Sequence, residues 1–576
     1  MSNTINYNVD GDGIATVVID IKDRKMNVAT AEFMDEFGRC IDTVADDSNV
    51  IGAVVTSGKS SFFAGADLKE LVGVFDGGMS KDDILKLAGT YSGLYRKLET
   101  SGKPWVAAIN GTALGAGLEL CLACHHRVAL DNPKSVLGLP EVMVGLLPGA
   151  GGTQRLSRLI GIREALPLML EGRHIPARKA VELGIADELA SDADDMMAKA
   201  RQWIVEGGDP EQPWDKKGFK VPGGAGAMNP KAVETFMVGT SLLAGKTQHN
   251  YPATIAIMSA VYEGTILPMD KALKIEVDYF TSLLTGPVAR NMIRTLFIDK
   301  GAADKLARRP QGVEKSSVSK LGVLGAGMMG AGIAYVSARS GQQVVLLDTE
   351  IDSAEKGKDY SRKLVEKQIG RKRMDKDAGD ALLDRIHPTT DYADLEGCEL
   401  VIEAVFEDRA IKADVTARTE AVIPEDAVFA SNTSTLPITG LAEASKRPKQ
   451  FIGIHFFSPV DKMPLVEIIL GEETGDVAIA RAMDYVRQIR KTPILVRDSR
   501  GFYTSRCFAT FVKEGMELLA EGVKPALIEN VAKMAGMPVG PLAVHDEVTI
   551  DLSYKILKQT QNDLGESYAA TASDDV

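Results

Sequence analysis

Apolar and polar positions follow two different periodicities along the chain, and these mark alternating strands and helices. Short apolar runs near the start predict strands at 14–19, 51–56, 106–109 and 127–130. Helical periodicity separates these runs at 31–44 and 92–98. This alternation predicts an α/β domain over residues 1–190.

The pattern then becomes helical and later returns to α/β. Residues 191–316 have the pattern of a linker with a long amphipathic helix at 269–284, ending in a polar connection at 308–317. A second α/β domain is predicted over 317–497, with strands at 321–324, 343–348, 400–405, 427–430 and 451–455. Residues 498–576 have helical periodicity throughout. We therefore expect an α/β multidomain fold with an all-helical C-terminal domain.

Length and charge narrow the class of protein. At 576 residues the chain is too long for one hydrophobic core, and its length suggests roughly four domains. A formal net charge of −13 argues against broad binding of nucleic acid or anionic membranes. No apolar run is long enough to span a bilayer, and residues 1–10 lack the pattern of a secretory signal. We expect a cytoplasmic protein without a transmembrane segment.

One cysteine spacing allows an alternative class. Residues 121–125, with Cys121, Cys124 and His125, match the attachment pattern of c-type haem, which would make this a haem or redox protein. Haem attachment requires export, so the simpler interpretation is a pair of small apolar residues on a helix beginning near Leu118. The same residues lie in one segment, unlike the ligands of most zinc sites. We therefore expect no metal, and a missing Soret band would exclude the haem alternative.

A glycine-rich turn in the second α/β domain predicts a dinucleotide site. Gly325, Gly327 and Gly330 form a G-x-G-x-x-G pattern that follows a predicted strand and opens a predicted helix. The first glycine permits the tight turn, the second lets the backbone approach a pyrophosphate, and the third allows close helix packing. Asp348 ends the next strand, where a carboxylate binds ribose hydroxyls and favours NAD over NADP.

A histidine and a glutamate in the same domain suggest a base. His455 ends an apolar strand, where open α/β sheets carry function, although a lone strand histidine is usually a core residue. Glu467 follows on the next apolar run and requires a partner if it is buried. Such a pair fixes the tautomer of the imidazole and raises its basicity, as oxidation of an alcohol requires.

From about 318 to its end, the chain resembles the L-3-hydroxyacyl-CoA dehydrogenase family. The resemblance is carried by residues 325–330, by SNTSTL at 431–436, and by HFFSPV at 455–460 with PLVE at 464–467. It implies that His455 takes the proton of the 3-hydroxyl group, that Glu467 orients His455, and that Ser434 touches the substrate hydroxyl. It places cofactor contacts at the three glycines and at Met329, Asp348, Glu407, Lys412, Ser434 and Ser458.

The sequence departs from this family's pattern at two positions. The family often has asparagine where Ser458 and Ser505 stand, and serine keeps a donor and an acceptor with a shorter reach. Some multifunctional members also carry serine at the first of these positions. The resemblance implies a substrate contact at Ser505, and the shorter side chain puts that contact in question.

Two glycine-rich turns in the first domain predict a site for a developing negative charge. Residues 61–67 and 112–117 can each present backbone N–H groups without obstruction by side chains. Two converging N–H groups can hold an enolate oxygen, and Glu119 and Glu141 can then supply the acid and the base. Either glutamate alone would more often be a surface residue, but both lie in apolar, glycine-rich segments where a free carboxylate is costly.

These motifs resemble the enoyl-CoA hydratase/isomerase (crotonase) family over about 7–190. The resemblance implies oxyanion-binding N–H groups at Ala66 and Ala116 and catalytic carboxylates at Glu119 and Glu141. The family often has glycine where Ala116 stands, but the donor is a backbone group and is kept. Two glutamates imply a hydratase, because members with one tend to be isomerases.

The order of the two halves resembles the α-subunit family of fatty-acid β-oxidation complexes. It implies a bifunctional enzyme that hydrates trans-2-enoyl-CoA and oxidises the product with NAD, with a thiolase β subunit as partner in a hetero-oligomer. It also implies that Asp299 borders the hydratase site. An alternative is one active half with a scaffolding half.

The end of the chain differs from that family. Its members continue past the equivalent of Val576 with a second helical repeat, so we expect an incomplete C-terminal domain. NAD should still bind, whereas oxidation would be weakened. We expect the tail 568–576 to be disordered.

Overall fold

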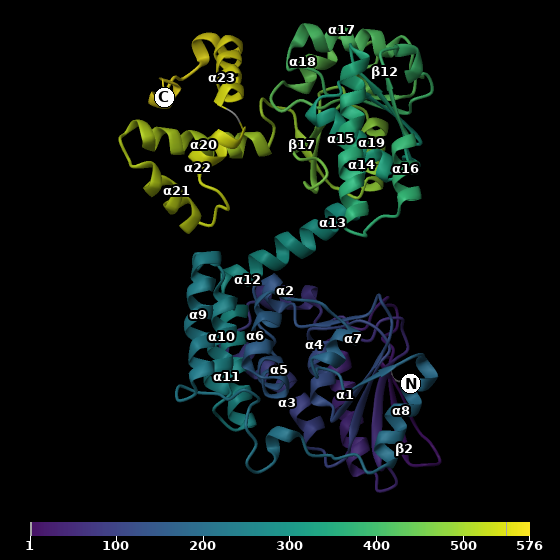
Figure 1. Cartoon of the computed structure of the whole chain (residues 1–576), viewed down its shortest axis with the longest axis vertical. Coiled ribbons are helices and arrows are strands. Elements are labelled where there is room, and N and C mark those ends of the chain that lie inside the picture. Colours follow the sequence, from purple (N-terminus) through teal and green to yellow (C-terminus); the bar gives the residue numbers. More distant parts are fainter. Residues whose placement is uncertain (1–2, 549, 576) are drawn as a thin grey trace. The chain divides into compact units, whose positions relative to one another are not determined.

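The structure is a computed structural model that describes residues 3–548 and 550–575. In these residues the chain forms two compact units (Figure 1). The first consists of Met1–Ile298 with Met534–Gly536, and the second of Asp299–Lys533 with Met537–Val576. Residues 191–298, which the sequence pattern sets apart as a linker, lie within the first unit.

The first unit is built on a mainly parallel sheet with the order β1-β2-β3-β4-β6-β9. β1 pairs antiparallel with β2, and the other neighbours are parallel. Its strands are β1 (Ile5–Val9), β2 (Ile14–Ile19), β3 (Gly52–Ser57), β4 (Trp105–Ile109), β6 (His126–Leu130) and β9 (Glu188–Ala190). The strands predicted in this domain are therefore confirmed to within one residue. A small second sheet contains β5 (Ala113–Leu114), β7 (Val136–Gly138) and β8 (Ile175–Pro176).

Helices cover both faces of the larger sheet. They are α1 (Ala31–Asp46), α2 (Leu68–Asp76), α3 (Lys81–Glu99), α4 (Ala116–Ala123), α5 (Gly152–Ile160), α6 (Ile162–Leu170), α7 (Ala177–Glu182) and α8 (Ala193–Val205). Val55 and Ala107 face a core shared with α1 and α3, while Val54 and Val106 face α8. This alternation follows from the two-residue period of a strand and leaves both faces buried.

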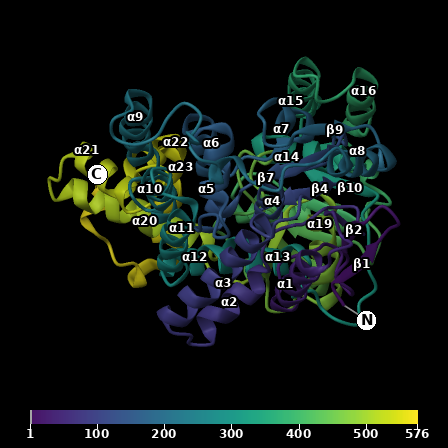
Figure 2. The ribbon, with the colours of Figure 1, turned by 90° about the horizontal axis from the view of Figure 1, so that it is seen from below.

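Further helices extend the first unit. They are α9 (Pro230–Thr247), α10 (Pro252–Gly264), α11 (Met269–Leu284) and α12 (Pro287–Met292), followed by a π-helical stretch at Ile293–Asp299. Figures 1 and 2 show α9, α10 and α11 side by side, and α11 packs against α3 and α5. The bounds predicted for the amphipathic helix at 269–284 are confirmed. Its apolar stripe, which includes Leu273 and Val277, provides this packing.

The second unit contains a sheet with the order β12-β11-β10-β13-β14-β15-β16-β17. β15 and β16 are antiparallel, and all other neighbours are parallel. Its strands are β10 (Lys320–Leu324), β11 (Gln343–Leu347), β12 (Ile386–Thr389), β13 (Leu400–Glu403), β14 (Val428–Ser431), β15 (Phe451–Phe456), β16 (Leu465–Leu470) and β17 (Thr492–Arg497). The strand order reverses beside β10, and such a switch point opens a crevice at the carboxyl ends of the strands.

Two apolar cores lie on the two faces of this second sheet. The helices that follow Asp299 are α13 (Lys300–Asp304), α14 (Met328–Arg339), α15 (Ile351–Gly370), α16 (Lys376–Asp384), α17 (Arg409–Glu420), α18 (Ile438–Ala442) and α19 (Asp476–Gln488). Ile333 of α14 and Met483 of α19 pack on one face of the sheet, and Val415 of α17 packs on the other. The Rossmann-type architecture expected for this domain is confirmed.

The end of the chain is helical, as predicted. It contains α20 (Thr504–Ala520), α21 (Pro525–Met534), α22 (Pro541–Val548) and α23 (Ile550–Leu564). The expected disorder of the tail is wrong for residues 568–575, where the hydroxyl group of Tyr568 donates to Asp574 and the N–H of Ser573 donates to Glu517. Composition could not show these carboxylates capping the last turns.

No helix among the described residues is both long enough and apolar enough to cross a membrane.

A half-buried ion pair fixes the entry into the second unit. Arg309 donates from Nε and Nη2 to the two carboxylate oxygens of Asp484, at 2.8 and 2.9 Å. The N–H of Ser316 donates to the same carboxylate at 2.9 Å. Burial raises the pKa of Asp484, but the hydrogen bonds from Arg309 and Ser316 outweigh burial and lower it.

Replacing this carboxylate should destabilise the second unit. We expect Asp484→Asn to lower its free energy of unfolding by about 1–2 kcal/mol at neutral pH, because half-buried Arg309 loses its counter-charge and its charge-assisted hydrogen bonds weaken. A carboxylate with a lowered pKa stabilises the fold above about pH 4 and loses that effect as the pH falls through its folded pKa. The difference between wild type and variant should therefore shrink in acid.

Calorimetry can measure this difference, with the transition of the second unit identified by its upward shift with NAD. Glu473→Gln, at an exposed position, is the control and should leave the transition unchanged. Equal stability of Asp484→Asn and wild type at neutral pH would contradict the assignment.

Candidate active sites

Two glycine turns meet in the first unit. The strand residues before them pair, since the N–H of Leu114 donates to the carbonyl of Phe63 at 2.9 Å. Gly65 and Gly115 both have positive φ, +103° and +54°, and a Cβ on Gly115 would lie 3.5 Å from the Cα of Gly65. Glycine is required here because the conformation is left-handed and the two backbones approach closely.

The predicted oxyanion donors follow these glycines directly. Ala66 is exposed at the start of α2, and Ala116 is the first residue of α4. Among the described residues, neither backbone N–H donates a hydrogen bond to the protein. Two open N–H groups on adjacent turns can bind an oxygen that develops negative charge.

Glu119 lies inside the unit on α4. Its side chain is buried, and its Oε1 accepts the N–H groups of Ala150 and Gly152, both at 2.8 Å. Burial raises the pKa of Glu119, whereas these two hydrogen bonds oppose the rise by stabilising the carboxylate.

Glu141 approaches from the opposite side of the turn. It begins a 3-10 helix, η1 (Glu141–Val144), and its Oε1 is the atom that a Cβ on Gly115 would meet at 2.8 Å. Its Oε2 is buried and has no hydrogen-bond partner among the described residues. Burial and the charge of Glu119 raise the pKa of Glu141 well above its usual range. The two predicted glutamates therefore lie together in the structure. Two N–H groups stabilise a negative charge on Glu119, whereas Oε2 of Glu141 has no donor among the described residues.

Sequence reasoning missed the charged groups behind this pair. Arg155 donates to both oxygens of Glu99, at 2.7 and 2.9 Å, and from Nη1 to the carbonyl of Ala150 at 2.6 Å. Glu276 on α11 is fully buried against the same turn. The sequence did contain a signal for Glu276, because this acidic residue lies on the apolar stripe of the predicted amphipathic helix.

The residues of the haem-like pattern have structural partners. Cys121 and Cys124 are buried within the core of the first unit. His125 accepts the N–H of Trp105 at Nδ1, at 3.0 Å, and its Nε2 lies 3.1 Å from the carbonyl of Glu99. Because both ring nitrogens are engaged by the backbone, His125 offers no free ligand to an iron.

The glycine turn of the second unit fits a dinucleotide. Gly325 has φ +89°, and a Cβ there would lie 2.7 Å from the carbonyl oxygen of Ala404. A Cβ on Gly330 would lie 1.8 Å from the carbonyl oxygen of Gly325, whereas one on Gly327 would meet nothing within 4 Å. Two of the glycines therefore close the turn, and Gly327 leaves its outer side open to a pyrophosphate.

The other predicted cofactor residues surround this turn. Asp348 follows β11, and its Oδ2 accepts the N–H of Ala326 at 2.7 Å, which holds the carboxylate beside the glycines. Met329 is the second residue of α14, whose amino end carries unpaired N–H groups and a positive dipole end. The hydroxyl group of Ser458 lies 3.5 Å from Sδ of Met328.

Glu407, Lys412 and Ser434 also lie together, although they come from different segments. Nζ of Lys412 lies 3.3 Å from Glu407, and Glu407 accepts the N–H of Ser434 at 3.0 Å. The structure adds Glu403, which was not predicted: Lys412 donates to it at 2.7 Å. Burial raises the pKa of Glu403, although Lys412 favours its charged form.

His455 and Glu467 face each other across the antiparallel pair β15–β16. Nδ1 of His455 lies 2.7 Å from Oε2 of Glu467, and both side chains are buried. Thr504, at the start of α20, donates to Glu467 from its N–H at 2.9 Å and from its hydroxyl group at 2.8 Å. Burial raises the pKa of Glu467, but the hydrogen bonds from His455 and Thr504 outweigh it and lower the pKa.

For two residues predicted to lie near the substrate, Ser505 and Asp299, the structure gives only their exposure and their place in the chain. Ser505 is half-buried and follows Thr504, so it lies one residue from the group that holds Glu467. Asp299 is exposed and is the first residue of the second unit. Its place at the border of the hydratase site stays a prediction.

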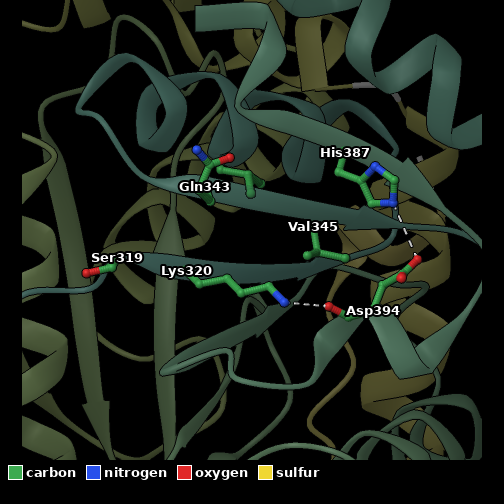
Figure 3. A pocket seen from close by; sticks show the side chains of 7 residues that line it. Ser319, Lys320, Gln343, Val345, His387 and Asp394 are labelled. Carbon is green, nitrogen blue, oxygen red and sulfur yellow. Dashed lines mark hydrogen bonds and ion pairs between the residues drawn. The ribbon is translucent and has the colours of Figure 1, made fainter.

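A hollow of about 370 Å³ lies elsewhere in the second unit (Figure 3). Lys320 and Gln343 line it at the amino ends of β10 and β11, with His387 and Asp394 beside them. Lys320 already donates to the backbone of Asp394 at 2.9 Å. The glycine turn and Asp348 are at the opposite, carboxyl ends of these strands, so this hollow is not the predicted cofactor site.

Known families match both halves of the chain. The model of the enoyl-CoA hydratase/isomerase family matches residues 12–207. The NAD binding domain of 3-hydroxyacyl-CoA dehydrogenase matches residues 320–499, and the C-terminal domain of the same family matches 501–575.

Individual relatives cover nearly the whole chain. The fatty acid oxidation complex subunit alpha of Shewanella amazonensis is 37% identical over 100% of this chain and 80% of its own length. The subunit of the same name from Shewanella halifaxensis is 36% identical over 99% of this chain and 80% of its own length. Among solved structures, the (S)-3-hydroxybutyryl-CoA dehydrogenase PaaH1 from Ralstonia eutropha is 33% identical, with a TM-score of 0.41, over 43% of this chain and 88% of that chain.

A methyl group at Gly330 should weaken NAD binding. The added Cβ of Gly330→Ala would overlap a backbone oxygen, which cannot rotate away, so the start of α14 must move. We expect the Kd for NAD to rise at least about tenfold, which corresponds to about 1.4 kcal/mol. Titration calorimetry with NAD measures this change.

Gly370→Ala is the matched control, because Gly370 ends a helix and its Cβ would meet nothing within 4 Å. It should bind NAD as the wild type does. A folded Gly330→Ala variant with unchanged affinity would show that this turn is not the cofactor site.

Proposed function

Because the chain belongs to the family of fatty acid oxidation complex alpha subunits, we propose that its two sites catalyse two consecutive reactions, one in each unit. The chain is a bifunctional enzyme: it hydrates trans-2-enoyl-CoA to L-3-hydroxyacyl-CoA and oxidises this product to 3-ketoacyl-CoA with NAD. The observation that supports the division is the presence of one complete set of acid–base groups in each unit.

In the first site, we assign the base to Glu119 and the acid to Glu141. The two N–H donors at 2.8 Å favour a carboxylate on Glu119, whereas Glu141 has an oxygen without a donor and keeps the proton. Glu119 accepts a proton from water as the water oxygen bonds to C3 of the enoyl group. Glu141 donates its proton to C2, and the N–H groups of Ala66 and Ala116 hold the thioester oxygen while it carries the enolate charge.

In the second site, His455 is the base. Its Nδ1 faces Glu467, which leaves Nε2 to take the proton of the 3-hydroxyl group. The charge of Glu467 stabilises the imidazolium ion that forms, and Thr504 keeps this carboxylate in place. Ser434 and Ser505 contact the substrate in this assignment. NAD bound at the glycine turn would supply the acceptor for the hydride that leaves C3.

The chain's own residues define the cofactor pocket. Gly327 would expose backbone to the pyrophosphate, Met329 and Ser458 would line this part of the pocket, and Asp348 would bind the ribose hydroxyls. Lys412 and Glu407 form the neighbouring charged wall. A carboxylate at Asp348 repels a 2′-phosphate, which favours NAD over NADP.

The partner in this proposal is a thiolase β subunit. The relatives are named as alpha subunits of a complex, and the 3-ketoacyl-CoA made by this chain is the substrate that a thiolase cleaves. The acyl-CoA thioester therefore passes through three active sites in the assembled complex.

The hydratase assignment predicts a selective loss in Glu141→Gln. We expect kcat for hydration of crotonyl-CoA to fall about 10²- to 10⁴-fold, because the amide cannot donate the proton that Glu141 supplies. Oxidation of 3-hydroxyacyl-CoA by the same variant should keep its wild-type rate, which shows that the protein is folded. Hydration at the wild-type rate would refute the assignment.

The reciprocal variant tests the second site. His455→Ala should lose NADH formation by a comparable factor, because alanine cannot take the hydroxyl proton that His455 accepts. Its affinity for NAD, measured by calorimetry, and its hydration rate should remain unchanged. If His455→Ala still oxidises 3-hydroxyacyl-CoA at the wild-type rate, another residue is the base.

A further inference from the structure

Two buried carboxylates share one backbone turn in the first unit. Along residues 150–153 the backbone N–H groups point alternately at Glu119 and at Glu276. The first and third donate to Glu119, both at 2.8 Å. The second and fourth donate to Glu276, the fourth at 2.9 Å. The turn 150–153 therefore binds Glu119 with two of its N–H groups and Glu276 with the other two.

Glu276 occupies a position where a charge is costly: burial and the charge of Glu119 raise its pKa to about 8, against the hydrogen bonds from the turn, which lower it. It lies on α11 between Leu273 and Val277 and has no exposed surface. Two backbone N–H groups and the hydroxyl group of Thr153 donate to it, which offsets the loss of hydration. No lysine, arginine or histidine among the described residues forms an ion pair with it, because Arg155 is paired with Glu99. Within the described part of the chain, its hydrogen-bond donors all belong to the turn 150–153.

The turn requires such a partner. It leads into α5, which has no side-chain cap, and Gly151 has a left-handed φ of +103°. The first N–H groups of a helix lack partners within the helix, and a carboxylate is the favoured group there. Glu276 supplies that carboxylate from another helix, while Arg155 holds the carbonyl of Ala150.

We propose that Glu276 is a positioning residue of the hydratase reaction: it holds the turn 150–153 in the conformation that fixes and stabilises the carboxylate of Glu119. This inference rests on the proposed role of Glu119 as the base. It follows that the helices after residue 191 complete the first active site and are part of the hydratase.

Several charged or titratable groups surround the two glutamates and can affect their titration. Around Glu119 and Glu276 they come from α3, the 3-10 helix η1 and α5, and they are Tyr95, Glu99, Glu141, Arg155 and Arg158. Positioning and charge can nevertheless be separated, because they shift the pKa of Glu119 in opposite directions. A turn that relaxes withdraws two donors and raises this pKa, whereas loss of a neighbouring negative charge lowers it.

Two variants exploit this difference. Glu276→Gln removes the ionisable group and places an amide donor against the donors of the turn, whereas Glu276→Asp keeps an ionisable carboxyl group and shortens the reach. We expect both to lower kcat for crotonyl-CoA hydration roughly 10- to 100-fold with little change in KM. In both, the acid limb of the pH–kcat profile should move to higher pH.

Asp278→Asn is the matched control, since Asp278 is an exposed acid on the same helix, and it should behave as the wild type. Oxidation of 3-hydroxyacyl-CoA by each variant reports whether the protein is intact. If Glu276→Gln does not fold, Thr153→Val removes one donor to Glu276 without changing charge, and should shift rate and profile in the same direction by less.

Unchanged kcat and acid limb in the folded variants would overturn the proposal. So would an acid limb that moves to lower pH in Glu276→Gln and stays in place in Glu276→Asp, because that result assigns Glu276 a purely electrostatic effect. Normal hydration by Glu141→Gln would instead overturn the proposed function, so the two failures are distinguishable.

Discussion

The cost of burying a carboxylate organises both units of this protein. A carboxylate removed from water must find donors, and the chain supplies them from backbone turns and from single hydroxyl or imidazole groups. Glu119 is held by two N–H groups of one turn, and Glu467 by His455 and Thr504. In each case the donors stabilise the charged form of the carboxylate and fix its position.

Three glycine turns before helices provide a second set of backbone donors, which face the ligands rather than the carboxylates. In the first unit, turns at Gly65 and Gly115 leave N–H groups open beside the two glutamates. In the second, the turn at Gly325 presents its open side at the switch point of the sheet, next to Asp348. The two folds differ, but both place backbone N–H groups at a helix start where a ligand carries negative charge.

Local patterns predicted most of the fold, because strand and helix positions followed from periodicity. Short motifs also predicted two pairs that the structure brings together, Glu119 with Glu141 and His455 with Glu467; their catalytic roles stay a proposal. What the sequence could not show were contacts between distant segments, such as Glu276 against the turn 150–153, or Thr504 against Glu467. The tail 568–575 is ordered although we expected disorder. Hydrogen bonds to the side chains of Asp574 and Glu517 hold it, and the composition of the tail does not show such bonds.

The central claim is that one chain performs two consecutive reactions at separate sites, and one coupled assay tests it most directly. Glu141→Gln and His455→Ala are mixed in equal amounts and given trans-2-enoyl-CoA and NAD. The account predicts that the mixture forms NADH after a lag, while neither variant alone does so at a comparable rate, because 3-hydroxyacyl-CoA released by one is oxidised by the other. NADH formation at the wild-type rate by either variant alone, or none from the mixture although each variant keeps its remaining activity, would contradict it.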